Sequence, residues 1–180
     1  MYDRQTETWW QQFLGEAIIG ELMGTVLGVI PARLESFANF KARANASAKV
    51  LVPNSRFRRA YGANPYVGCD SHDRPYPFFR GEMPSEVAPL SRVININGEA
   101  WALDLLRKKT RVEIKDGIII TWEPGQNSAL DAGQISRGVD VGNVVVQKPN
   151  GKGVLEDIPY RVDFAFAFRA FYPDAPIHVR

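Results

Sequence analysis

Residues 93–103 read Val-Ile-Asn-Ile-Asn-Gly-Glu-Ala-Trp-Ala-Leu, so that Asn97-Gly98 stands between two apolar runs. This arrangement is the strongest short-range signal for a β-hairpin, because both turn positions need a positive φ and these two residues tolerate it. Residues 93–96 predict the first strand, and residues 100–103 predict the second.

Two further turn signals follow. Asp116-Gly117 separates residues 112–114, where apolar and charged side chains alternate, from the apolar run 118–122. Asn150-Gly151 comes after three consecutive valines that end at Val146. Five or six short strands joined by tight turns predict a mostly antiparallel sheet.

Two segments predict short helices. Ser36 is a suitable cap for a helix that runs to about Ala44. Residues 160–172 give two signals, because apolar residues alternate as in a strand up to Phe168 and also recur at helical spacing. Periodicity alone does not decide between strand and helix there.

A weak internal repeat favours the helix. A shift of 127 positions places Ser36 on Asp163 and Phe37 on Phe164. Other aligned pairs are Gly15 with Gly142, Val50 with Ile177 and Val52 with Val179. We therefore predict a helix from its cap at Asp163 to Tyr172.

These elements predict an α+β fold, mostly antiparallel β-sheet with two short helices and a weak internal duplication. We predict a single domain over residues 1–180, in which 1–52 are the tail of a first repeat, 53–90 are a long loop and 91–180 are a second repeat. The loop holds six prolines and six aromatic residues. Disordered segments contain few aromatic residues, so this loop is expected to be ordered.

Composition excludes several classes of protein. The chain has 180 residues, 45% of them hydrophobic, which is enough for a buried core. Its formal net charge of +2 does not favour nucleic acid as a partner. Residues 17–31, the most apolar stretch, are too few to cross a bilayer, and the first residues lack the pattern of a signal peptide. We expect no cofactor, no nucleic-acid partner and no transmembrane segment of its own.

Several motifs are spread along the chain. They are Met1-Tyr2-Asp3-Arg4-Gln5-Thr6, Gly15-Glu16-Ala17-Ile18-Ile19-Gly20, Tyr61-Gly62 with Pro65-Tyr66 and Gly68, Ile96-Asn97-Gly98-Glu99-Ala100, and Phe171-Tyr172-Pro173-Asp174. Together they resemble a bacterial family known as domain of unknown function 3179. The resemblance spans most of the chain and implies a periplasmic or otherwise extracytoplasmic domain.

The chain departs from the family pattern in two places. Members of this family resemble duplications, in which an Asn-Gly-Glu-Ala strand is followed by a strand ending in Cys-Pro-x-Cys and then by the Tyr-Asp-Arg segment. This chain begins at that segment, and residues 122–126 stand where its second copy would carry a cysteine pair. We therefore expect that the native protein extends upstream of Met1, or that another chain supplies the missing strands.

Candidate binding residues gather in two segments. The resemblance places Asp3 and Arg4 in its sharpest motif, and Trp9 lies close by. The loop contributes Arg58, Arg59, Tyr61 and Tyr66, which suit an anionic small molecule or an acidic partner. The structural alternatives are a salt bridge at a strand end, and a loop whose aromatic rings dock on the sheet while its arginines pair with nearby acids.

Residues 69–73 combine a thiol, an imidazole and two carboxylates. Such a set is half of a transition-metal site, which makes Cys69 and His72 weak candidates for metal ligands. An ordinary polar loop is favoured, since His178 is the only other histidine. The chain contains none of the catalytic motifs that we sought, and we assign no catalytic residue.

These observations favour a non-catalytic binding or accessory subunit of a protein assembly. Other protein subunits are the expected partners, and attachment to a membrane complex is compatible with the resemblance. The alternative is a redox-linked enzyme whose reactive thiol or selenol pair lies upstream or in a partner chain. Whether the protein is an enzyme therefore stays open at this point.

Overall fold

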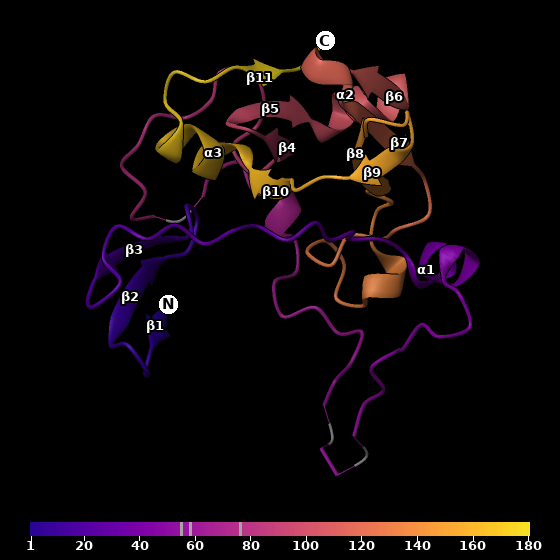
Figure 1. The fold of residues 1–180 in the computed structure, drawn as a ribbon, viewed down its shortest axis with the longest axis horizontal. Coiled ribbons are helices and arrows are strands. Elements are labelled where there is room, and N and C mark those ends of the chain that lie inside the picture. The colour runs from indigo at the N-terminus through magenta and orange to yellow at the C-terminus, as the bar shows by residue number, and fades with distance from the viewer. Residues whose placement is uncertain (55, 58, 76) are drawn as a thin grey trace. The chain divides into compact units, whose positions relative to one another are not determined.

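The computed structural model describes residues 1–54, 56–57, 59–75 and 77–180 (Figure 1). The chain forms two compact units, Met1–Pro31 and Ala32–Arg180, and each is described by itself.

The first unit is a three-stranded antiparallel sheet in the order β1-β2-β3. Its strands are β1 (Tyr2–Asp3), β2 (Thr8–Gln11) and β3 (Glu16–Ile19). Gly20 follows β3 at φ +109°, and a Cβ at this position would lie 2.5 Å from the backbone oxygen of Glu7. Only glycine therefore lets β3 end so close to the chain that enters β2.

The second unit contains two four-stranded sheets, in the orders β10-β4-β5-β11 and β6-β7-β8-β9. The strands of the first sheet are β4 (Arg92–Ile96), β5 (Glu99–Ala102), β10 (Arg161–Phe164) and β11 (Ile177–His178). Those of the second are β6 (Arg111–Glu113), β7 (Ile119–Glu123), β8 (Asn143–Pro149) and β9 (Leu155–Asp157). The helices are α1 (Phe37–Arg43), α2 (Leu103–Lys109) and α3 (Ala165–Phe171), and the 3-10 turns are η1 (Cys69–Ser71), η2 (Lys115–Gly117) and η3 (Ile135–Arg137). The predicted α+β class, with a mostly antiparallel sheet, is confirmed.

All three predicted hairpins are present. Asn97 and Gly98 join β4 to β5 with φ values of 51° and 82°, as a type I′ turn requires. Asp116-Gly117 lies in the connection from β6 to β7, and Asn150-Gly151 lies between β8 and β9.

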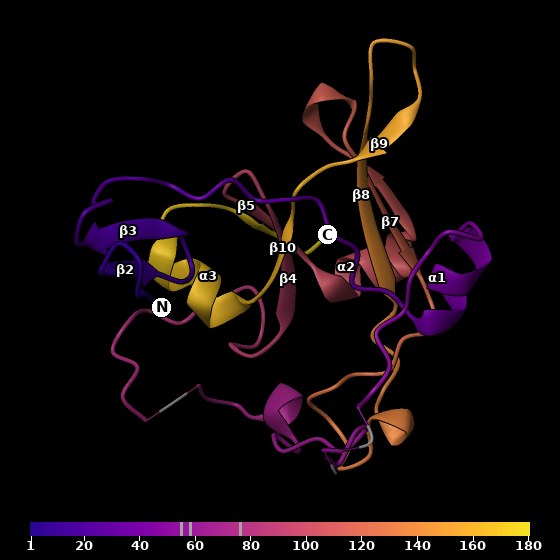
Figure 2. The same cartoon turned by 60° about the horizontal axis from the view of Figure 1, so that its bottom comes forward.

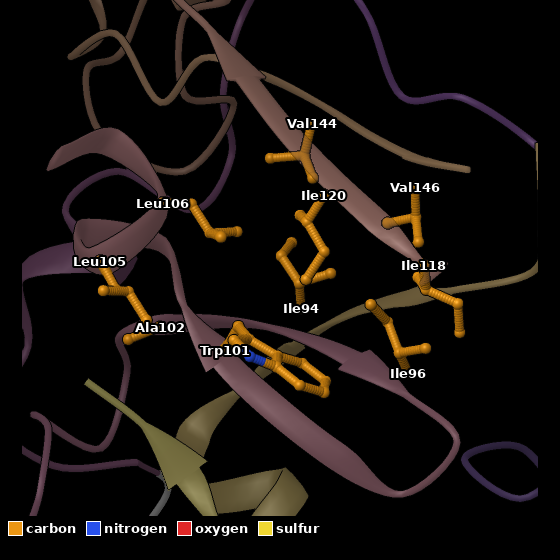
Figure 3. Close-up of a cluster of buried hydrophobic side chains, with 10 residues drawn as sticks. All are labelled: Ile94, Ile96, Trp101, Ala102, Leu105, Leu106, Ile118, Ile120, Val144 and Val146. Carbon is orange, nitrogen blue, oxygen red and sulfur yellow. The ribbon is translucent and has the colours of Figure 1, made fainter. Parts of the chain in front are cut away.

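The hairpin of β4 and β5 is buried on both faces. One face, which carries Ile94, Ile96 and Trp101, packs with α2 and with side chains of β7 and β8 (Figure 3). On the other face, Val93 and Ala100 cluster with residues of α3 and β11. Successive strand residues point to opposite faces, so a strand covered on both sides is apolar at neighbouring positions.

The helix α2 occupies the place where the sequence predicts the end of a strand. Leu103 begins this helix, which ends at Thr110 with φ 57°. Leu105 and Leu106 are buried in the same cluster as the hairpin. Burying two leucines on one side of a helical turn contributes more stability than one additional strand residue would.

Residues 160–172 contain a strand followed directly by a helix, so each of the two sequence signals is correct over part of the segment. Strand alternation holds over β10, and helical spacing holds over α3. Asp163 is not the helix cap that the sequence predicts, because it lies in β10 and Phe164 precedes the helix. Its carboxylate accepts a hydrogen bond from the Asn95 amide at 3.0 Å, and burial raises the pKa of Asp163.

The internal repeat becomes clearer in the structure. The helices α1 and α3 have equal length and begin 128 residues apart, at Phe37 and Ala165, one residue more than the predicted shift. This shift aligns Arg33-Leu34-Glu35 with Arg161-Val162-Asp163, and Phe40-Lys41-Ala42 with Phe168-Arg169-Ala170. Val50 still aligns with Ile177, as predicted, when the connection after α1 has one residue more than the connection after α3.

The helix α1 buries none of its residues. Ser36 caps it as predicted, since its side chain accepts the N–H of Asn39 at 3.3 Å. Phe37 is 63% exposed, and the ring of Phe40 contacts Phe37 and the guanidinium of Arg43 in its own helix. Figures 1 and 2 show α1 at the margin of the second unit, with no helix or strand on its outer side.

Part of the long loop is anchored to the segment that precedes η3. The N–H of Asn64 donates to the carbonyl of Gly133 at 2.9 Å, and the Asn64 side chain is buried. The N–H of Gly68 donates to the carbonyl of Asp131 at 2.7 Å. These contacts fix η1 and the residues just before it.

A matched pair of substitutions tests the difference between the two helices. Phe168→Ala should lower the free energy of unfolding by about 3–5 kcal/mol, because the ring is 0% exposed and its loss leaves a cavity. Phe40→Ala, at the corresponding position of α1, should cost less than about 1 kcal/mol. Urea denaturation followed by circular dichroism measures both values. Equal losses would contradict this description of α1.

Candidate functional site

A cavity of about 240 Å³ lies in the second unit beside η1, the start of β4 and α2. Its charged lining residues are Asp70, Arg92, Asp104, Arg107 and Asp131. Apolar side chains, among them Leu90, Leu103 and Val141, form the rest of its wall. Apolar walls with a few polar groups are typical of small-molecule sites. Three carboxylates against two guanidinium groups do not favour an anion.

The guanidinium of Arg92 connects two loops at this cavity. Its Nη2 lies 3.0 Å from Asp70 Oδ2 and 2.8 Å from Ser128 Oγ. The Ser128 hydroxyl donates to the same carboxylate and accepts the N–H of Leu130 at 3.0 Å. These groups satisfy one another and tie η1 to the start of β4 and to the loop after β7.

This network positions the wall of the cavity. Ser128 is 1% exposed, and its oxygen already accepts hydrogen bonds from Arg92 and Leu130. A nucleophile needs a reachable oxygen and an adjacent base, so this hydroxyl does not meet the requirements for attack on a bound molecule. Arg107 and Asp104, 3.6 Å apart, are the more accessible charged pair of the lining.

The predicted site residues of the first unit lie on β1, on β2 and in the turn between them. The Asp3 carboxylate accepts the Thr6 hydroxyl at 2.6 Å and the N–H of Gln5 at 2.9 Å. The Thr6 hydroxyl, followed by the Gln5 N–H, holds the pKa of Asp3 below its ordinary value. Arg4 is exposed, and among the described residues no ion pair joins it to Asp3. Trp9 is 52% exposed and its ring lies 5.1 Å from that of Tyr2.

The predicted site residues of the loop belong to the second unit. Arg59, Tyr61 and Tyr66 are exposed, and Arg58 lies outside the described residues. The six predicted residues that the structure describes thus fall on two units. That they form one pocket stays a prediction.

The segment around Cys69, which holds the candidate metal ligands, is connected to β4 by an ion pair. Cys69 is half-buried, and its neighbour Asp70 is paired with Arg92. Over the part of the chain that the structure describes, no three His, Cys, Asp or Glu side chains are placed to hold a metal ion. The candidates Cys69 and His72 are therefore not joined by a third described ligand.

Sequence reasoning did not find Arg92 and Ser128. Each lies far along the chain from Asp70, and no motif spacing links the three positions. Only the tertiary fold brings them together, so the one usable signal was a charged residue at the start of a strand that is otherwise buried.

A polar groove of about 430 Å³ separates α1 from β7 and β8. Arg33 forms a two-pronged ion pair with Asp157, with both N–O distances at 2.6 Å, and thereby holds the pKa of that carboxyl below its usual range. Arg43 of α1 pairs with Glu35. Arg33 thus attaches the segment before α1 to β9, while Phe37 is largely exposed.

Comparison with known proteins adds the family. The family described as "Protein of unknown function (DUF3179)" matches residues 1–175. The chain belongs to the DUF3179 family. No curated protein and no solved structure matches this DUF3179 protein. None of its described helices is long and apolar enough to cross a membrane.

The substitution Asp70→Ala tests the network at the cavity. It leaves the largely buried guanidinium of Arg92 without its anion, so the free energy of unfolding should fall by about 1–3 kcal/mol. Limited proteolysis should also cut the loop around η1 faster. Asp73→Ala, an exposed change in the same loop, is the control and should stay within about 0.5 kcal/mol of the parent. Equal effects would show that Asp70 anchors nothing.

Proposed function

We propose that this DUF3179 protein is a non-catalytic binding or accessory subunit of a protein assembly, with α1 and the segment after it as its binding surface. One observation carries the proposal: α1 buries no residue, whereas α3, of the same length, buries Ala165, Phe166 and Phe168. A seven-residue helix gains its stability from packing and not from propensity. A helix that buries none of its residues against the described part of the chain therefore suits a surface that another polypeptide covers.

The chain beyond α1 supports the same role. Leu51 is fully exposed, and its neighbours Val50 and Val52 are exposed as well. Together with Phe37 they provide several large apolar side chains within one stretch of sequence. Three adjacent exposed apolar residues are more than the single scattered ones that a globular surface normally carries, and they suit an interaction surface.

The first unit offers a second apolar surface. Tyr2 pairs with Trp9 across β1 and β2, and Trp9 pairs with Ile19 across β2 and β3. All three side chains are exposed. Residues that are directly opposite in antiparallel strands share a face, so the three form a stripe across the sheet. Such a stripe also suits contact with another protein.

The family resemblance supports a proposal for the compartment of this assembly. We place the assembly outside the cytoplasm, and a membrane complex is one suitable setting. The redox alternative requires a thiol or selenol pair from another segment, since Cys69 is the one cysteine of this sequence. It stays a prediction.

Co-purification from the native source tests the proposal. The tagged chain, cross-linked in the cell, should bring down at least one further polypeptide whose intact mass identifies it. Phe37→Asp should reduce its recovery at least about tenfold, because a charge in an apolar contact carries a large desolvation cost. Val154→Asp, at a comparably exposed valine between β8 and β9, is the matched control and should retain the partner. A partner recovered equally with both variants, or no partner, would contradict the proposal.

A further inference from the structure

The hairpin of β4 and β5 is held on three sides by the elements that follow it. The strand β10 pairs antiparallel with β4, with Asp163 opposite Val93. The strand β11 pairs parallel with β5, with Ile177 opposite Ala100. The helix α3 closes the face between them, where Phe168 is buried with Val93 and Ala100. We name β10, α3 and β11 the second clasp.

The same three parts occur earlier in the chain. Residues 33–36 correspond to β10, and the helix α1 corresponds to α3. Residues 50–52 correspond to residues 177–179, which include β11. Residues 33–35 read Arg-Leu-Glu and repeat the order of a basic, an aliphatic and an acidic residue that begins β10. Phe40 stands at the position that corresponds to Phe168. We name residues 33–52 the first clasp.

The first clasp holds no hairpin. Within the described residues, no strand pairs with 33–36 or with 50–52. Val50 is exposed, whereas its counterpart Ile177 is buried. Phe40 is half-buried beside Phe37 and Arg43 of its own helix, whereas its counterpart Phe168 is fully buried. The surface that surrounds a hairpin in the second clasp is thus open in the first.

We propose that the first clasp binds a β-hairpin of the β4–β5 kind, carried by a further polypeptide segment. This inference rests on the proposed binding role of α1 and names the partner. One strand of the incoming hairpin pairs antiparallel with residues 33–36, and its other strand pairs parallel with residues 50–52.

The second clasp defines the chemistry of this partner. Small apolar side chains face Phe40, as Val93 and Ala100 face Phe168. Glu35, at the position of Asp163, is already paired with Arg43, so the incoming hairpin needs no polar donor at this position. An apolar hairpin therefore fits, and a highly charged peptide does not.

Part of the first clasp is already positioned for strand pairing. Ser36 has extended backbone angles of φ −64° and ψ 150°. Its N–H donates to Asn143 Oδ1 at 2.6 Å, and Arg33 is paired with Asp157. A strand segment that is held before binding loses less conformational freedom when a partner pairs with it.

A graft of the chain's own hairpin tests this inference. A second copy of residues 87–128 is joined directly before Met1, which places the added hairpin as far upstream of α1 as the native hairpin is of α3. Hydrogen exchange with mass spectrometry is compared with that of the unmodified full chain. Amides of residues 33–36 and 50–52 should exchange at least about tenfold more slowly in the graft.

The control graft carries Val93→Asp and Ala100→Asp in the added copy only. Slower exchange in the first graft and not in the control supports the inference. Unchanged exchange in both grafts, or equal slowing in both, overturns it. Amides of α3 report in every sample whether the second clasp is intact. If the inference fails while Phe37→Asp still removes the native partner, the binding role stands and its partner is of another class.

A second arm covers a graft that does not fold. Residues 87–128, fused to an inert carrier protein, are added in trans to the unmodified full chain at increasing concentration. Saturable slowing of exchange at residues 33–36 and 50–52 supports the inference, and its absence at the highest concentration overturns it. The carrier alone gives the baseline.

Discussion

The hairpin of β4 and β5 is the element on which the second unit depends, because both of its faces are buried. Ile94, Ile96 and Trp101 join it to α2 and to the second sheet, and Val93 and Ala100 join it to α3 and β11. A single apolar strand pair thus links two clusters that would otherwise be separate. Burial on both sides also explains why α3 must lie where it does, and why an equivalent helix without a hairpin, α1, stays at the margin (Figure 2).

Much of this arrangement was predictable from turn chemistry. The three Gly-containing turns place the hairpins, and at Asn97-Gly98 and Asp116-Gly117 a positive φ at both turn positions narrows the choice of residues. Periodicity was less informative. Residues 160–172 combine strand and helix spacing because a strand is followed at once by a helix. Leu103 begins α2 and not a longer β5, and this helix buries Leu105 and Leu106 in the core. Such switches depend on tertiary burial, which local sequence does not report.

The candidate site was less predictable than the fold. The sequence favoured an ordinary polar loop over a metal site at residues 69–73. It did not indicate that Asp70 pairs with Arg92 and Ser128, which lie in distant parts of the chain. The motif residues Asp3 and Trp9 lie in the first unit, and Asp3 is engaged by its own turn. The repeat was the most useful sequence signal for function, because its two copies differ in what covers them and thereby distinguish a packed helix from an open one.

The central claim is that α1 is a helix without its packing partner in the chain alone, while α3 has that partner. Amide hydrogen exchange of the unmodified chain, resolved by NMR, tests it most directly. The amides of α3 should exchange only with global unfolding, and those of α1 should exchange through local opening, with protection at least about a hundredfold weaker. Equal protection of the two helices would contradict the claim.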